Sequence, residues 1–176
     1  MTSHISASEF GYLIVSEING LGFCGGLLLV TSAGRPIEFH CTAPVIANRA
    51  QQILYGATLK EFLVCDQIGV SLLDKLKRPP SVVLVQDRQL GKLASTVDFP
   101  VVLVDQQRPE VHQPESQDPR EDSGHLLEIA NQQFEVFGNQ ADQAEQILRS
   151  FAETLPISEP FERIREAINE AHSEAA

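Results

Sequence analysis

The first part of the chain carries the pattern that most limits its fold, three strand-like segments separated by very short turns. Residues 10–18 are rich in β-branched and aromatic side chains, and the Asn19-Gly20 dipeptide that follows favours the positive φ angles of a tight turn. Residues 23–32 and 36–42 continue the pattern, and the aliphatic run inside 23–32 predicts a central strand that is covered on both faces. Strands joined this closely predict an antiparallel three-stranded meander.

Helices and two further strands are predicted after the meander. Apolar residues recur at helical spacing over 47–55 and 58–77, and a pair of prolines ends the second helix. Residues 81–87 and 99–105 are short aliphatic runs typical of buried parallel strands, with room for a short crossover helix between them. The predicted fold class is therefore α/β. The order of strands and helices along the chain is also that of a ribonuclease H-like core. This analogy rests on the order alone, because no sequence motif supports it.

The composition changes sharply near residue 106. Residues 107–123 contain three prolines, many charges and one aliphatic residue, Val111. Such a segment has little apolar surface to offset the entropy lost on ordering. We predict an α/β core domain at 1–106, a flexible linker at 107–123 and a small α+β C-terminal unit at 124–176, made of a hairpin and two helices.

The two helices of the predicted C-terminal unit are acidic and amphipathic. Their apolar stripes contain Phe151 and Leu155 on the first helix and Phe161, Ile164 and Ile168 on the second. These side chains could pack on the preceding hairpin, or they could anchor the helices in the groove of a partner protein. The sequence leaves both arrangements open, and it leaves the oligomeric state unknown.

Charge and hydropathy narrow the range of partners. The formal net charge is −11, which argues against broad binding to a phosphate backbone, since that binding requires many cations. The longest apolar run is too short to span a bilayer, and the first residues do not resemble a signal peptide. Three cysteines without framework spacing suit a reducing compartment. We expect a cytoplasmic protein whose partner is another protein or a larger complex; a membrane is not expected as a partner, and nucleic acid is disfavoured.

The segment from Gly20 to Cys41 (GLGFCGGLLLVTSAGRPIEFHC) combines glycines, cysteines and a histidine. Phosphate-binding glycines lie between a strand and a helix N-terminus, whereas Gly25 and Gly26 lie inside a predicted strand. Glycines in that position mark a bulge, a bend or the close packing of a neighbour. We therefore expect an architectural role for the pair.

The cysteines are candidates for metal ligands and for nucleophiles. Cys24, His40, Cys41 and Cys65 are ligand types that zinc accepts, but the close cysteine pair of structural zinc sites is absent. His40 and Cys41 are adjacent on a strand and should point to opposite faces. Cys24 could meet His40 across the hairpin only diagonally. Neither a metal site nor a Cys–His nucleophile is favoured.

Carboxylates offer another candidate site. In ribonuclease H-like enzymes, acidic residues on the first strand, the following helix and the fourth strand bind two divalent cations. The analogy implies Glu17, Glu61 or Asp66, and Asp87 at these positions, although the usual aspartate of the first strand is missing. Asp105 follows the last aliphatic run at the same carboxyl edge, where open α/β sheets bind ligands.

Two functional hypotheses follow. No nucleophile elbow, His-Glu-x-x-His, Walker-type loop or Cys-x-x-Cys pair is present. This absence, together with the linker and the amphipathic tail, favours a non-catalytic adaptor or accessory subunit without a cofactor. The alternative is a hydrolase or nuclease that depends on Mg²⁺ or Mn²⁺, with Glu17, Asp87 and Asp105 as its catalytic residues.

Overall fold

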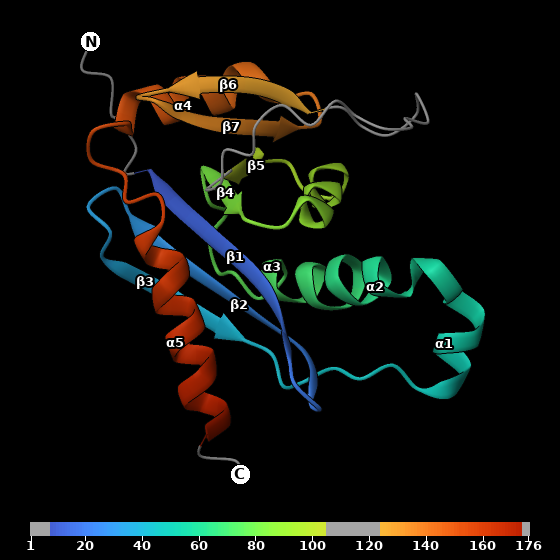
Figure 1. Cartoon of the computed structure of the whole chain (residues 1–176). Helices are drawn as coiled ribbons and strands as arrows, with labels where there is room; N and C mark the ends of the chain where they lie inside the picture. The colour runs from blue at the N-terminus through green and yellow to red at the C-terminus, as the bar shows by residue number, and fades with distance from the viewer. Residues whose placement is uncertain (1–7, 105–123, 174–176) are drawn as a thin grey trace.

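The computed structural model describes residues 8–104 and 124–173 (Figure 1). This part of the chain forms one seven-stranded mixed sheet in the order β3-β2-β1-β4-β5-β7-β6. The strands are β1 (Glu9–Ile18), β2 (Gly22–Thr31), β3 (Pro36–Cys41), β4 (Val82–Val85), β5 (Val101–Val104), β6 (His125–Ile129) and β7 (Gln132–Phe137). The α/β fold class is confirmed.

The predicted meander and parallel strands are both observed. β1 and β2 pair antiparallel along their whole length, and β2 pairs antiparallel with β3. Gly20 adopts a φ of +76° in the first turn, as the Asn-Gly dipeptide predicts. β4 runs parallel to β1, and β5 runs parallel to β4. The meander and the parallel strands therefore join in one sheet, with β1 between β2 and β4.

The helices differ more from the prediction. They are α1 (Arg49–Tyr55), η1 (Gly56–Thr58), α2 (Leu59–Glu61), η2 (Phe62–Gly69), α3 (Val70–Leu73), η3 (Arg88–Ser95), α4 (Ala141–Phe151) and α5 (Glu159–Ser173). The predicted continuous α-helix at 58–77 contains the π-helix η2 in its middle. Because π turns hold more residues than α turns, the buried face rotates. Val64 and Ile68 are buried, whereas Leu59 and Phe62 stay partly exposed.

Helices cover both faces of the sheet. One core cluster combines alternate residues of β1, such as Phe10 and Tyr12, with apolar residues of α4 and α5. The other core cluster combines residues that point to the opposite face of the sheet, such as Leu13, with apolar residues of η2, α3 and η3. α5 lies across β1 and β2 (Figure 1). No helix in the described ranges is long and apolar enough to cross a membrane.

Gly25 and Gly26 lie where the two helical layers approach β2 most closely. A Cβ atom on Gly25 would overlap Ile68 of η2, and one on Gly26 would overlap Ile164 of α5. The register shift between β2 and β3 falls further along, between Leu29 and Val30. The glycine pair thus permits close packing on both faces of a central strand and does not form a bulge.

The C-terminal elements share the sheet and the core with the elements before them. β7 pairs antiparallel with β5, and β6 pairs with β7 at the edge. The predicted linker at 107–123 lies outside the described residues, as does the predicted boundary at residue 106. Both stay predictions. The hairpin and α5 nevertheless extend and cover the same sheet that the meander begins.

The residues predicted to bind a partner are mostly core residues. Phe161 and Ile164 are fully buried, Ile168 and Leu155 are nearly so, and Phe151 is half-buried against the same cluster. Of the two arrangements that the sequence left open, the structure shows these side chains packed within their own chain. The apolar face of α5 packs against β1 and β2 of the sheet in the same chain.

Candidate functional site

The carboxyl edge shared by β1 and β4 is the structural candidate for a site. Ligands of open α/β sheets bind outside the carboxyl ends of parallel strands. Leu13 pairs with Val85, so the residues that follow Val85 lie beside the last part of β1. This placement brings Gln86 and Asp87 to the edge where Glu17 also lies.

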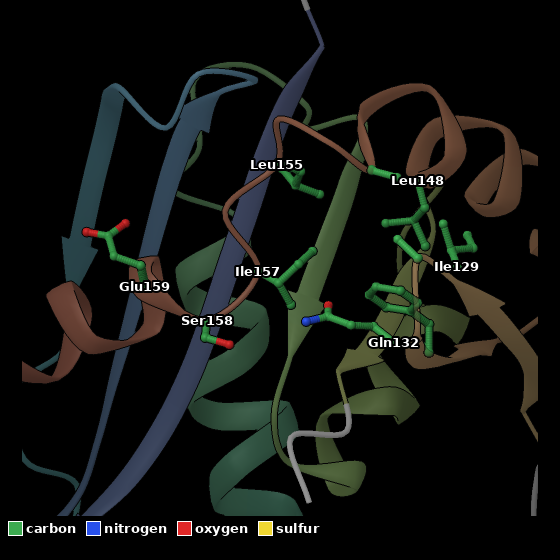
Figure 2. A pocket seen from close by; sticks show the side chains of 10 residues that line it. Ile129, Gln132, Leu148, Leu155, Ile157, Ser158 and Glu159 are labelled. Carbon is green, nitrogen blue, oxygen red and sulfur yellow. The ribbon is translucent and has the colours of Figure 1, made fainter.

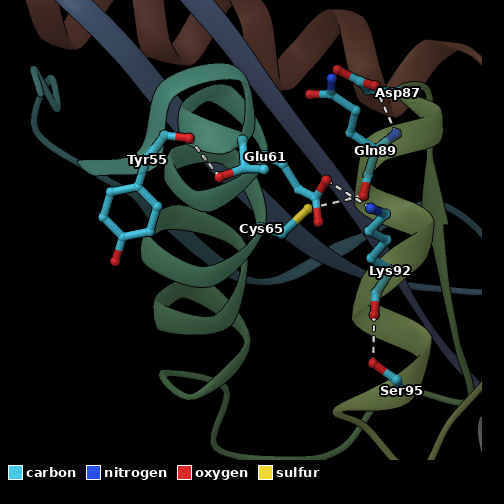
Figure 3. A network of polar contacts seen from close by, with 8 residues as sticks. Tyr55, Glu61, Cys65, Asp87, Gln89, Lys92 and Ser95 are labelled. Atoms are coloured by element: carbon cyan, nitrogen blue, oxygen red, sulfur yellow. Dashed lines mark hydrogen bonds and ion pairs between the residues drawn. The ribbon is translucent and has the colours of Figure 1, made fainter. Parts of the chain in front are cut away.

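On the η2 face of this edge, polar side chains connect η2 with η3 (Figure 3). The carboxylate of Asp87 accepts a hydrogen bond from the backbone N–H of Gln89 at 2.9 Å, which caps η3. The thiol of Cys65 donates to the carbonyl of Gln89 at 2.9 Å, and Lys92 pairs with Glu61 at 2.6 Å. Asp87 and Glu61 therefore already have structural partners in the protein.

The electrostatics of this network keep Cys65 protonated. Burial, together with the nearby carboxylates of Glu61, Asp66 and Asp87, raises the pKa of the Cys65 thiol to about 12 against the opposing charge of Lys92. Three of the acidic positions expected from the ribonuclease H-like analogy, Glu61, Asp66 and Asp87, thus lie near a neutral thiol. Cys65 acts as a hydrogen-bond donor between two helical segments.

On the α5 face, a cleft of about 280 Å³ opens beside the end of β1. It is lined by Ser16, Glu17, Ile18, Asn19, Arg165, Ile168 and Asn169. The guanidinium of Arg165 donates a hydrogen bond to the side-chain carbonyl of Gln86, directly after β4. Among the described residues that line this cleft, a guanidinium and amides are therefore combined with a single carboxylate, that of Glu17.

A larger cavity of about 420 Å³ lies between the β6–β7 turn and the segment that joins α4 to α5 (Figure 2). Its lining is mostly apolar, and Gln132, Ser158 and Glu159 supply the polar groups. Glu159 pairs with Arg163 at 2.6 Å. The described residues that line the cavity include no pair of titratable side chains suited to acid–base chemistry, so it is not the candidate catalytic site.

The structure gives Cys24 a different neighbour from the one considered from sequence. Its sulfur lies 3.3 Å from Nε2 of His172, near the end of α5, while His40 pairs with Glu38 at 3.1 Å on β3. Cys24 is fully buried, and burial, followed by the proximity of Cys41, raises its pKa. His172 was missed because 148 positions separate it from Cys24 in the sequence.

We expect Cys24 and Cys65 to react slowly with iodoacetamide in the native protein. Both thiols are buried with a raised pKa, which lowers the thiolate fraction, whereas Cys41 is only partly buried. Timed alkylation followed by peptide mass spectrometry should label Cys41 first, which provides an internal control. Labelling of Cys24 as fast as Cys41 would show that Cys24 is accessible and activated.

The described residues do not fit a two-metal centre. Among residues 8–104 and 124–173, no group of three His, Cys, Asp or Glu side chains is placed to hold a metal ion. Glu17 lines the cleft on the α5 side, whereas Asp87 caps η3. Asp105 lies outside the described residues and stays a prediction. Cys24 and Cys65 belong to the clusters on opposite faces of the sheet and share no site.

Comparison with known proteins shows what the fold is. No family model and no curated protein matches this chain. The structure of Ciona intestinalis endonuclease V in complex with a 23mer DNA containing an inosine followed by a ribo-adenosine matches 97% of this chain and 88% of its own, with 13% identity and a TM-score of 0.56. The fold is shared with endonuclease V.

Two further structures agree with this match. Human ENDOV matches 98% of this chain and 87% of its own, with 13% identity and a TM-score of 0.54. A second Ciona intestinalis endonuclease V complex, with a 24mer DNA, matches 94% and 88%, with 11% identity and a TM-score of 0.54. The likeness therefore extends over almost all of each chain and is a likeness of fold.

These neighbours correct two expectations drawn from the sequence. The hypothesis of a non-catalytic adaptor acting through protein contacts is contradicted, because the full-length structural neighbours are endonucleases. The expectation that nucleic acid is not a partner is contradicted as well, because two of the neighbours are complexes with DNA. Net charge averages over the whole surface, and so it does not describe the local charge of one cleft.

Proposed function

We propose that this protein acts on nucleic acid as a phosphodiester hydrolase of the endonuclease type. The observation that supports the proposal is the fold match with endonuclease V over 97% of this chain. The cleft beside the end of β1 lies at the sheet edge where α/β folds bind ligands. Its Arg165 guanidinium is a group suited to phosphate, because its fork of donors matches phosphate oxygens.

We propose Mg²⁺ or Mn²⁺ as the cofactor in place of the expectation of none. A divalent cation stabilises the charge that develops during phosphodiester hydrolysis, and metal-assisted hydrolysis is common among nucleases. The described carboxylates do not form a complete site for the cation. We therefore propose only that Asp87, which follows the carboxyl end of β4, is needed for cleavage. The cation requirement is therefore the first property to measure.

Asp87→Asn is expected to reduce cleavage at least about a hundredfold, the lower end of the usual effect of removing a catalytic acid or base. Asparagine caps helices as well as aspartate, so the free energy of unfolding should change by only a few tenths of a kcal/mol. The measurement is cleavage of a labelled DNA containing an inosine followed by a ribo-adenosine, with unmodified DNA and RNA of the same sequence in parallel. Each substrate is incubated with Mg²⁺, Mn²⁺ or EDTA.

The exposed Asp98 offers a matched control, and Asp98→Asn should leave cleavage unchanged. The proposal is supported if cleavage requires Mg²⁺ or Mn²⁺ and falls in Asp87→Asn but not in Asp98→Asn. Failure of the folded wild-type protein to cleave or bind any of the three substrates would contradict it. Calorimetry that detects binding of neither cation would count against the metal requirement.

A further inference from the structure

We infer that Arg165 anchors one phosphate of a nucleic-acid strand in the cleft beside β1, without a metal ion. The inference rests on the proposed action on nucleic acid and adds to it a named residue and a mode of binding. It follows from three properties of the cleft, namely the rigid placement of Arg165, its unneutralised charge and the chemistry of the neighbouring side chains.

The placement of Arg165 is fixed by the residues on either side of it in α5. Ile164 and Ile168 are buried against β2, where Gly26 leaves no space between strand and helix. The turn of α5 that carries Arg165 therefore has little freedom to shift. A hydrogen bond to Gln86 further holds the guanidinium over the end of β4. A guanidinium held in advance loses less entropy when it binds an anion.

The charge of Arg165 differs from that of most other described arginines. Arg78, Arg88, Arg149 and Arg163 each form an ion pair with a glutamate. Arg165 instead bonds to the neutral amide of Gln86, and no carboxylate of the described part of the chain lies within ion-pair distance of it. Its full positive charge and its remaining N–H donors are available to an anion.

The rest of the cleft suits a nucleotide unit. Ser16, Asn19 and Asn169 supply a hydroxyl and two amides, which can bond to a sugar hydroxyl or a base edge. Glu17 can accept a hydrogen bond from a sugar hydroxyl, and because its charge repels phosphate, the bound phosphate belongs on the Arg165 side of the cleft. A volume of about 280 Å³ is at the lower limit of ligand pockets, which suits one phosphate with its sugar.

Fluorescence anisotropy with a labelled single-stranded oligonucleotide in EDTA tests this inference in the full-length protein. Arg165→Gln should weaken binding about tenfold and lower the slope of log K against log salt by about one, as expected for the loss of one phosphate contact. Arg165→Lys should keep the salt slope while losing part of the affinity, because lysine keeps the charge without the fork. Thermal midpoints of all variants confirm the fold.

Gln86→Glu provides a second test that leaves Arg165 in place. The new carboxylate should pair with the guanidinium, neutralise it and weaken binding about as much as Arg165→Gln. Arg149→Gln is the matched control, since Arg149 is an exposed arginine on α4 that is paired with Glu145. This control should bind within about twofold of the wild type, the change expected of a residue outside the contact.

The outcomes separate the inference from the proposed function. Wild-type affinity in Arg165→Gln, or binding that disappears in EDTA, overturns the inference while the proposed action on nucleic acid stands. Absence of both binding and cleavage in the wild-type protein overturns the two together. Weakened, EDTA-resistant binding in both Arg165→Gln and Gln86→Glu supports the anchor.

Discussion

Replacing Gly26 with valine is expected to destabilise the protein by about 3 kcal/mol, the upper end of the usual cost of overpacking. A Cβ atom at this position would overlap Ile164 and would lie 3.0 Å from Cδ1 of Ile168. β2 cannot move away, because it is hydrogen-bonded to β1 on one side and to β3 on the other. The strain must then displace α5. Urea unfolding followed by circular dichroism measures the loss.

The clash predicts a specific rescue. Ile164→Ala alone should cost about 2–5 kcal/mol through the cavity it leaves. In the double variant, the valine side chain should occupy part of that cavity, so the loss should be at least about 1 kcal/mol smaller than the sum of the two single losses. Additive losses would show that Gly26 and Ile164 do not compete for the same space.

Much of the sheet could be predicted because its determinants are local. Asn19-Gly20 specifies a tight turn, and the predicted C-terminal hairpin is observed, with Ala130 and Asn131 of its turn both at positive φ. The aliphatic runs at 81–87 and 99–105 contain β4 and β5. Turn chemistry and hydrophobic alternation act over a few residues, so a single sequence carries them.

The candidate site could not be predicted in the same way. The contact of Arg165 with Gln86 joins residues 79 positions apart, and that of Cys24 with His172 joins residues 148 positions apart. Local sequence patterns do not specify the position along β1 and β2 at which α5 packs. The π-helix at 62–69 was missed because the apolar spacing there also fits an α-helix.

The failure of the adaptor hypothesis has a related cause. It rested on the absence of catalytic motifs together with the linker and the amphipathic tail, yet the structure of endonuclease V has a similar fold at only 13% identity. The absence of a known motif therefore does not exclude a site built from other residues. In this chain the carboxyl edge holds Gln86 and Arg165, which no catalytic motif describes, and only the assembled sheet brings them together.

Replacing Phe161 with alanine is expected to cost about 4 kcal/mol, within the range for a buried aromatic residue. The Phe161 ring is fully buried and packs edge-to-face on Tyr12, with the ring centroids 5.1 Å apart. Its removal leaves a cavity between α5 and β1 that the hydrogen-bonded strand cannot fill. Phe39→Ala is the control, because Phe39 is 39% exposed on β3 and should cost only about 1 kcal/mol. An unchanged urea midpoint in Phe161→Ala would mean that α5 contributes little to the fold, and it would contradict the packing from which the position of Arg165 is argued.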